Sequence, residues 1–122
     1  MGRKKVLVIE DNALNMKLVR ILLGLGGYEV LEAPDAEKGL PLAREHRPDL
    51  ILMDVQLPGM DGLTATRMLK EDPALADTAV VAMTSYALPG DDEKARQAGC
   101  TGYMTKPIDT RAFLKDIVHY FP

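Results

Sequence analysis

The chain has 122 residues, of which 47% are hydrophobic and 27% are charged, and its formal net charge is −3 at pH 7. This length suffices for one domain with its own hydrophobic core, and the mild negative charge argues against nucleic acid or an anionic membrane as the main partner. A lone cysteine, Cys100, excludes an internal disulfide and fits a reducing cytoplasm. One cysteine and two histidines in the whole chain are too few for a structural zinc site.

The first half of the chain alternates strand and helix. The apolar run 5–9 predicts a strand buried on both faces, and 28–31 predicts a weaker strand near a sheet edge. Between them lies a helix that the Gly26-Gly27 pair ends. Its apolar residues form one stripe at helical spacing, made of Leu14, Leu18, Ile21, Leu22 and Leu25. A second helix begins after Asp35, its predicted N-cap, and contains Pro41, which should kink or shorten it because proline lacks an N–H group.

The second half continues the alternation. The runs 50–53 and 79–83 predict two more buried strands, and 102–104 predicts an edge strand. The helix at roughly 88–98 offers only Ala95 and Ala98 for packing, which makes it a candidate for motion, although a solvated charged face explains the same pattern.

In the last helix Phe113, Ile117 and Tyr120 share one face, and Asp109 or Thr110 is the expected N-cap. Five strands that alternate with helices predict parallel βαβ units and a three-layer α/β sandwich. We find no linker or second domain in the sequence, so we expect residues 1–122 to form a single domain with no output domain.

Polar residues follow four of the predicted strands. Glu10 and Asp11 follow the first strand, Asp54 ends the third, Thr84 ends the fourth, and Lys106 lies just past the fifth. Open parallel sheets place their ligands beyond these strand ends. Each residue alone has an ordinary explanation, such as a helix N-terminus that favours acidic residues, a turn, or a surface position. The convergence of all these residues on one edge of the sheet favours a functional site over these separate explanations.

The residue types at this edge fit phosphoryl transfer. Clustered carboxylates repel one another unless a hard cation lies among them, and Mg²⁺ prefers one to three carboxylates together with water and phosphate oxygens. A carboxylate can also act as a nucleophile and form an aspartyl phosphate. Catalysis then depends on positioning and on charge neutralisation, which Mg²⁺, the Lys106 ammonium and the Thr84 hydroxyl would supply.

The motifs together resemble the response-regulator receiver domain of two-component, chemotaxis-regulator-like signalling proteins. They are Glu10-Asp11-Asn12, Asp49-Leu-Ile-Leu-Met-Asp54, Leu57-Pro-Gly-Met-Asp-Gly62, Met83-Thr84-Ser85 and Thr105-Lys106-Pro107. The resemblance covers essentially the whole chain. It is strongest to the DivK-type single-domain regulators and to receivers of hybrid histidine kinases, which share sequence segments such as Asn12-Ala-Leu-Asn-Met16.

The resemblance implies a phosphoacceptor and a Mg²⁺ site. Asp54 matches the acceptor, and Glu10 and Asp11 match the acid pair that holds the metal, with Asp11 and Asp54 as direct ligands and Glu10 acting through water. The backbone carbonyl of Gln56 matches the remaining protein ligand. The acid pair is Glu-Asp where many members of the family have Asp-Asp.

The resemblance also implies a switch and a fold. Lys106 matches the lysine that pairs with the acceptor, Thr84 the hydroxyl that moves toward the phosphoryl group, and Tyr103 the aromatic residue that turns inward with it. A cis peptide bond should join Lys106 to Pro107. The implied fold is flavodoxin-like, with the strand order 2-1-3-4-5, an arrangement for which receiver proteins are a standard example.

The implied function is that of a phosphoprotein in a phosphorelay. The chain would take a phosphoryl group from a sensor histidine kinase or a histidine phosphotransfer protein, and would signal to a downstream protein by a conformational switch. It would bind neither nucleic acid nor membrane, would be a monomer or weak dimer, and would catalyse only its own phosphorylation and slow dephosphorylation. Tyr86 and Gln56 occupy positions that influence phosphoryl lifetime in this family, and a bulky Tyr86 predicts slow hydrolysis.

The first helix is the candidate docking site for a partner, through Asn12, Asn15, Met16 and Val19, unless Met16 and Val19 belong to the core. Two other classes share parts of the pattern. A haloacid-dehalogenase-type phosphatase would need a second acid where Gln56 stands, and a flavodoxin-type electron carrier would need a phosphate-binding loop where the acidic Glu10-Asp11-Asn12 stands.

Overall fold

A five-stranded sheet forms the centre of the molecule. The computed structural model describes residues 3–85 and 88–121, and all of the strand pairings within this part are parallel. The strand order is β2-β1-β3-β4-β5, which confirms the predicted fold class and places the two weaker strands at the sheet edges. The strands are β1 Lys5–Ile9, β2 Glu29–Ala33, β3 Leu50–Asp54, β4 Ala79–Thr84 and β5 Gly102–Thr105.

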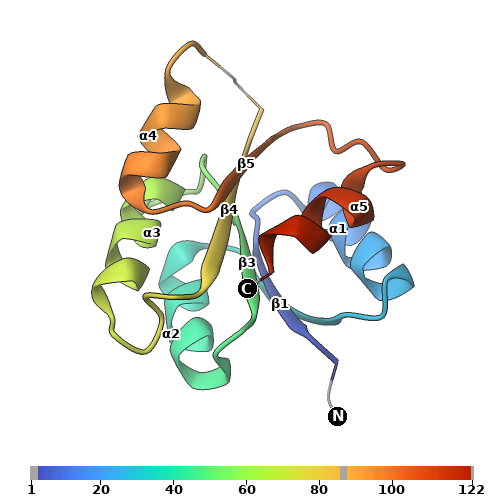
Figure 1. Cartoon of the computed structure of the whole chain (residues 1–122), viewed down its shortest axis with the longest axis horizontal. Coiled ribbons are helices and arrows are strands. Elements are labelled where there is room, and N and C mark those ends of the chain that lie inside the picture. The colour runs from blue at the N-terminus through green and yellow to red at the C-terminus, as the bar shows by residue number, and fades with distance from the viewer. Residues whose placement is uncertain (1–2, 86–87, 122) are drawn as a thin grey trace.

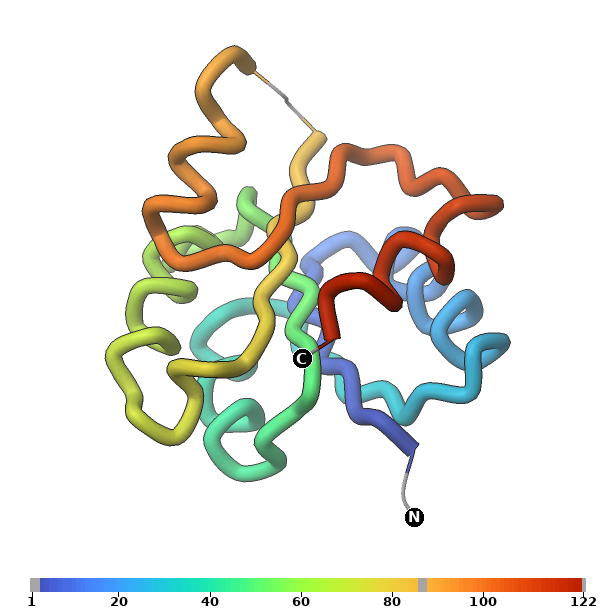
Figure 2. Tube along the Cα trace, viewed as in Figure 1, coloured from blue at the N-terminus to red at the C-terminus, as the bar shows by residue number. Residues whose placement is uncertain are grey.

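Helices cover both faces of the sheet (Figure 1). Helices α1 and α5 lie on one face, and α2, α3 and α4 lie on the other, which the chain reaches by crossing over between parallel strands (Figure 2). No helix in the described part of the chain is long and apolar enough to cross a membrane. The helices are α1 Ala13–Leu25, α2 Ala36–His46, α3 Gly62–Glu71, α4 Asp91–Ala98 and α5 Phe113–Ile117, followed by the 3₁₀ turn η1 Val118–Tyr120.

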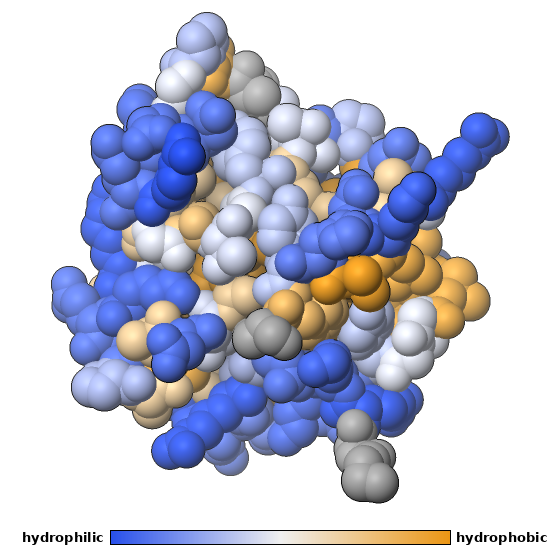
Figure 3. Space-filling model, in the orientation of Figure 1, coloured by the Kyte–Doolittle hydropathy of each residue, from blue (hydrophilic) through white to orange (hydrophobic). Residues whose placement is uncertain are grey.

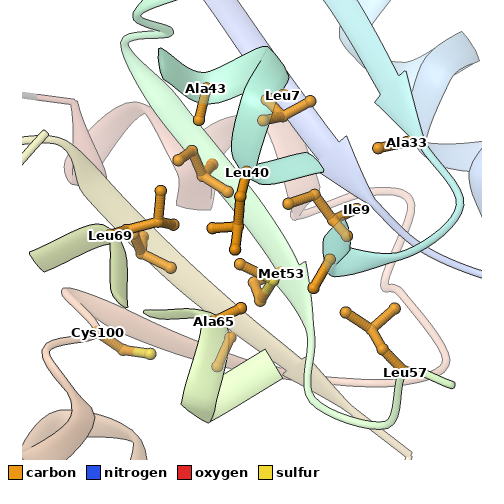
Figure 4. Close-up of a cluster of buried hydrophobic side chains, with 14 of the residues drawn as sticks. Leu7, Ile9, Ala33, Leu40, Ala43, Met53, Leu57, Ala65, Leu69 and Cys100 are labelled. Atoms are coloured by element: carbon orange, nitrogen blue, oxygen red, sulfur yellow. The ribbon is translucent and has the colours of Figure 1, made fainter. Parts of the chain in front are cut away.

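The sheet separates two hydrophobic cores because successive side chains of a strand point to opposite faces. Leu7, Ile9 and Met53 pack against α2, α3 and α4 in the cluster drawn in Figure 4. Val8 and Leu52, one residue along in β1 and β3, pack against α1 and α5 on the other face. The three central strands are therefore buried on both sides, which explains their uninterrupted apolar runs.

Short polar side chains begin three of the helices. Asn12 caps α1 by accepting hydrogen bonds from the N–H groups of Leu14 and Asn15, and Asp35 caps α2 as predicted. Asp61 caps α3 through the N–H groups of Leu63 and Thr64. The hydrogen bond from Thr64, which outweighs partial burial, holds the pKa of Asp61 below its usual value. These caps fix the point at which the chain leaves each strand-end loop.

Two sequence-based expectations change, and a third is confirmed. Helix α2 runs on past Pro41 to His46, so Pro41 does not shorten it. Helix α5 begins at Phe113, after Ala112, so neither Asp109 nor Thr110 is its N-cap; Asp109 instead accepts a hydrogen bond from the Arg111 N–H in the preceding turn. Helix α4 buries only Ala95 and Ala98, as its composition predicted.

The buried face of α1 differs from its leucine-rich stripe. Met16, Val19, Leu22 and Leu23 face the core, whereas Leu14, Ile21 and Leu25 are exposed. Met16 and Val19 are therefore core residues, and the expectation that they form a docking surface is wrong. The helix carries apolar residues on two faces, and the sheet covers only one of them.

Gly62 is required where α3 starts, next to the end of β3. Its N–H donates to the Val55 carbonyl at 3.0 Å, and an added Cβ would overlap the backbone carbonyl oxygen of Asp54. We expect Gly62→Ala to lower the free energy of unfolding by about 2 kcal/mol, a typical cost of forced overpacking. Gly24→Ala is the matched control, because its Cβ would meet no atom within 4 Å and a helical Gly→Ala change stabilises by about 0.5–1 kcal/mol. Urea denaturation measures both, and equal effects of the two substitutions would contradict this account.

Candidate functional site

The polar residues predicted to converge do so at the carboxyl end of the sheet. Strands β1, β3, β4 and β5 deliver Glu10, Asp54, Thr84 and Lys106 to this edge, and each of these side chains follows or ends its strand. Glu10, Asp54 and Lys106 border an open cleft of about 270 Å³. The residues that line it are Glu10, Asp11, Asn12, Asn15, Asp54, Gln56, Ser85 and Lys106.

Lys106 holds two carboxylates at the floor of this cleft. Its Nζ lies 2.8 Å from Glu10 Oε2 and 3.1 Å from Asp54 Oδ2, and the Lys106 and Glu10 side chains are only 9% and 0% exposed. Burial opposes the charge on Lys106, but the hydrogen bonds to Glu10 and Asp54 outweigh it and raise the pKa of Lys106. The ammonium therefore stays charged at neutral pH and compensates the buried acids.

Asp54 is fixed at both of its oxygens. Oδ1 accepts a hydrogen bond from the Gln56 N–H at 3.0 Å, and Oδ2 faces Lys106. Burial raises the pKa of Asp54; the Gln56 N–H opposes this effect, and the negative charge of Glu10 adds to it. The carboxylate is thus oriented and costly to keep charged, a combination typical of functional groups.

The acidic residues can share one cation. Ligand oxygens of Glu10, Asp11 and Asp54 lie within 4.8 Å of one another, and Asp11 is exposed to the cleft. An all-oxygen set of this size suits Mg²⁺, which keeps several waters and binds few carboxylates. The Glu10 carboxylate already accepts from the Asn12 N–H at 3.2 Å and pairs with Lys106, so it is the least available of the three.

Thr84 and Tyr103 meet at a second cavity beside the cleft. This cavity of about 290 Å³ lies between the site and α4, and Gln56 borders both spaces. The Tyr103 hydroxyl is buried and has no hydrogen-bond partner among the described residues. Burial, with a smaller contribution from Asp91 and Asp92, raises the pKa of Tyr103.

The loop after β5 aims Lys106 at the cleft. The Lys106 N–H donates to the Thr84 carbonyl at 2.7 Å, which extends the β4–β5 pairing to the lysine itself. The Lys106–Pro107 peptide bond is cis, the conformation that the receiver resemblance implies. The prediction about Tyr86 falls outside the described residues.

Two residues beside the site had no assigned part in the chemistry. Asn15 lines the cleft, although the sequence suggested it only as a docking residue. Glu37, in the first turn of α2, accepts a hydrogen bond from the Met60 N–H at 3.2 Å and so braces the loop after β3. No local pattern could have indicated Glu37, because its partner lies 23 residues away in the chain.

A buried carboxylate, a paired lysine and an acid cluster at the ends of a 2-1-3-4-5 parallel sheet are the features of a domain of the receiver class. The model of the response regulator receiver domain family matches residues 6–118, and the chain belongs to this family. Receiver domains are signalling domains that are phosphorylated on aspartate, bind Mg²⁺ at their acidic pocket, and interact with histidine kinases and downstream targets. Family membership removes the phosphatase and electron-carrier alternatives.

Known relatives cover almost the whole chain. The polar-differentiation response regulator DivK of Brucella anthropi is 49% identical over 117 residues, 96% of this chain and 95% of that protein. The chemotaxis protein CheY4 of Vibrio cholerae superposes with a TM-score of 0.93 at 27% identity, covering 98% of this chain and 100% of that one. The receiver domain of sensor histidine kinase PA1611 from Pseudomonas aeruginosa PAO1, which has a magnesium ion coordinated in its active-site cleft, superposes with a TM-score of 0.89 at 31% identity over 98% of each chain.

The charge on Asp54 should cost stability. Because its pKa is raised, the folded state holds the Asp54 proton more tightly than the unfolded chain does, so its contribution to stability falls as the pH rises above the usual carboxyl value of 3.8. We expect Asp54→Asn to raise the free energy of unfolding at neutral pH by about 1 kcal/mol in EDTA. This difference should close as the solution is acidified below about pH 4.

Urea denaturation at several pH values measures this difference. Asp77→Asn, which removes an exposed carboxylate, is the control and should change stability little at any pH. A less stable Asp54→Asn variant at neutral pH would show that the ion pair with Lys106 outweighs the cost of burying the charge.

Proposed function

We propose that Asp54 accepts a phosphoryl group from a phosphohistidine of a sensor kinase or histidine phosphotransfer protein, and that the chain passes this signal to a downstream protein by changing shape. The observation that carries the proposal is the Asp54 carboxylate itself. It is buried, oriented at both oxygens and open to a cleft bordered by further acids and a charged lysine. Family membership supports the same reaction.

The residues for Mg²⁺ are present. Asp11, Asp54 and the backbone carbonyl of Gln56 would hold the ion directly, and Glu10 would act through water because its oxygens are occupied by Lys106 and the Asn12 N–H. When bound, Mg²⁺ would neutralise charge on the phosphoryl oxygens. The magnesium ion in the cleft of the Pseudomonas aeruginosa receiver domain supports this assignment.

The transfer requires little covalent chemistry from the protein. An Asp54 oxygen attacks phosphorus, a P–O bond forms, the P–N bond to the donor histidine breaks, and the electron pair of that bond goes to the imidazole nitrogen. Lys106 keeps its proton and moves from the carboxylate toward the phosphoryl oxygens, which carry the charge that the carboxylate has lost. The chain catalyses its own phosphorylation in this way, and it also catalyses its own slow dephosphorylation.

The phosphoryl group then changes the positions of Thr84 and Tyr103 at the second cavity. It offers the Thr84 hydroxyl a new acceptor, and movement of Thr84 makes room for Tyr103, whose buried hydroxyl and ring border the same cavity. Helix α4 forms the outer wall and buries little more than Ala95 and Ala98. Such a thinly packed element can shift at low cost, so phosphorylation biases a two-state equilibrium of the α4–β5–α5 face.

The outer face of α1 is the proposed docking surface for the phosphodonor. Leu14, Ile21 and Leu25 are 77%, 50% and 76% exposed, and they form one stripe that starts beside the cleft. With Val118 of η1 they belong to the apolar area on the side of α1 and α5 (Figure 3). Lys17 borders the stripe, whereas Arg20 is engaged by Glu32 at 3.0 Å. An apolar helix with acidic flanks on the donor would complement this surface.

We further propose that residues 1–122 act as a single cytoplasmic receiver unit that works as a monomer or weak dimer. All of the described strands belong to one sheet, and each face of that sheet carries one core. The match of the receiver family to residues 6–118 leaves few residues outside this unit.

Intact-mass spectrometry after incubation with acetyl phosphate tests the reaction. We expect a single phosphoryl adduct on the wild type that requires Mg²⁺ and is abolished by EDTA, because charge neutralisation is needed for transfer. Asp54→Asn should form no adduct, and Asp77→Asn, which changes an exposed carboxylate far along the chain, should form as much as the wild type. An adduct of equal yield on Asp54→Asn would overturn the assignment of the acceptor.

Transfer from a phosphorylated protein donor tests the docking surface. We expect Leu14→Ser with Leu25→Ser, or Lys17→Glu alone, to slow this transfer by about tenfold or more, since apolar anchors at an interface each contribute 1 kcal/mol or above. Phosphorylation by acetyl phosphate should not change. Met68→Ser on α3, which removes another exposed apolar side chain, is the control; equal slowing by it would refute a specific α1 surface.

A further inference from the structure

We propose that the side-chain amide of Asn15 contacts the reacting group on the far side of phosphorus from Asp54, and that it thereby sets the rates at which the phosphoryl group enters and leaves. This group is the leaving nitrogen of a phosphoramidate donor during transfer and a water molecule during hydrolysis. The inference rests on the proposed phosphorylation of Asp54 and assigns a further substrate-contacting residue to that reaction.

The position of Asn15 places its side chain at the cleft. The residue lies in the first turn of α1, directly after the loop that carries Glu10 and Asp11, and it lines the same space as Asp54 and Lys106. It is half-buried, whereas its neighbours Leu14 and Asn12 are exposed. The amide therefore borders the site and is partly shielded from bulk water.

Among the described residues, the Asn15 amide has no hydrogen-bond partner, in contrast to the side chains of Asn12, Glu10 and Asp54 that line the same cleft. Asn12 Oδ1 accepts hydrogen bonds from Leu14 and Asn15, both at 3.0 Å, to cap the helix. The carboxylates of Glu10 and Asp54 are engaged by Lys106 and by backbone N–H groups. Within residues 3–85 and 88–121, the Asn15 side chain forms no hydrogen bond, so its two donors and its acceptor remain available.

Local stability does not explain an asparagine at this position. Asparagine is a poorer helix former than alanine or leucine because its side chain competes for backbone hydrogen bonds. At the helix N-cap, where Asn12 stands, this tendency is useful, but position 15 lies inside the helix and its side chain caps nothing. A locally unfavourable residue at the border of a site is expected where the residue serves function.

A neutral amide suits both reactions, phosphoryl transfer from the donor and hydrolysis of the phosphorylated Asp54. During transfer the P–N bond breaks and its electron pair goes to the leaving nitrogen, to which the Asn15 NH₂ group can donate a hydrogen bond. During hydrolysis a water oxygen bonds to phosphorus, the bond to the Asp54 oxygen breaks, Asp54 recovers its electron pair as a carboxylate, and the proton of the water goes to the released phosphate. The Asn15 carbonyl oxygen can accept a hydrogen bond from that water. A carboxylate at this position could not donate and would repel the phosphoryl group.

The experiment uses phosphoramidate as donor, with saturating Mg²⁺ and intact-mass detection, on the wild type, Asn15→Ala and Asn15→Leu. Leucine keeps the branched shape of asparagine and lacks its hydrogen-bonding groups. The rate of adduct formation and, after removal of the donor, the rate of adduct loss should both fall roughly three- to tenfold in both variants, as expected for one lost hydrogen bond to the reacting group. Thermal unfolding should show both variants at least as stable as the wild type, and calorimetry should show unchanged Mg²⁺ affinity.

Lys38→Ala, a truncation at an exposed helical position of α2, is the control and should leave both rates unchanged. Rates that change by less than about twofold in both Asn15 variants would overturn the inference, as would a loss of Mg²⁺ affinity that accounts for the rate change, or an effect confined to Asn15→Ala. A wild type that forms no adduct with Mg²⁺ would instead refute the proposed function on which the inference depends.

Discussion

The ammonium group of Lys106 is the interaction on which the site depends. Two carboxylates, from Glu10 and Asp54, are buried at the end of the sheet, and each would be strongly destabilising without a compensating charge. One cation that serves both holds the ends of β1, β3 and β5 together at the point where the chemistry occurs. In the proposed reaction, phosphorylation of Asp54 would remove one of these negative charges and replace it with phosphoryl oxygens. The contact with Lys106, which stabilises the resting state, would then respond to the signal.

Burial of the charged Asp54 carboxylate lowers the stability of the fold and, in the proposed function, keeps this group ready to react. Burial and the neighbouring Glu10 raise the pKa of Asp54, so the charged carboxylate has a cost in stability, which the hydrophobic cores on the two faces of the sheet offset. The cavity shared by Thr84 and Tyr103, and the thinly packed helix α4 that borders it, lie beside this buried carboxylate. In the proposed function, a change of charge at Asp54 would act next to this thinly packed helix.

In the proposed function, helix α1 connects the binding of the phosphodonor to the transfer of the phosphoryl group. Its inner face packs on the sheet through Met16, Val19 and Leu23, its outer face exposes Leu14, Ile21 and Leu25, and its first turn brings Asn15 to the cleft. A donor that binds along the outer face would present its phosphohistidine to the mouth of the same cleft. In the proposed function, docking and transfer would depend on this one helix, which would limit the geometry in which a donor can react.

The sequence by itself determined the class of fold and most of the site. Uninterrupted apolar runs predict strands buried on both faces, and strand–helix alternation predicts a parallel sheet whose carboxyl ends bring Glu10, Asp54, Thr84 and Lys106 together, since these rules depend only on local residues and chain order. Only the tertiary structure decided which face of α1 is buried, because both faces are apolar and the choice depends on what packs against them. It also decided that Glu10 pairs with Lys106 and that Glu37 accepts from the Met60 N–H, because such contacts between residues far apart in sequence arise from the crossing of elements and leave no periodic signal in the chain.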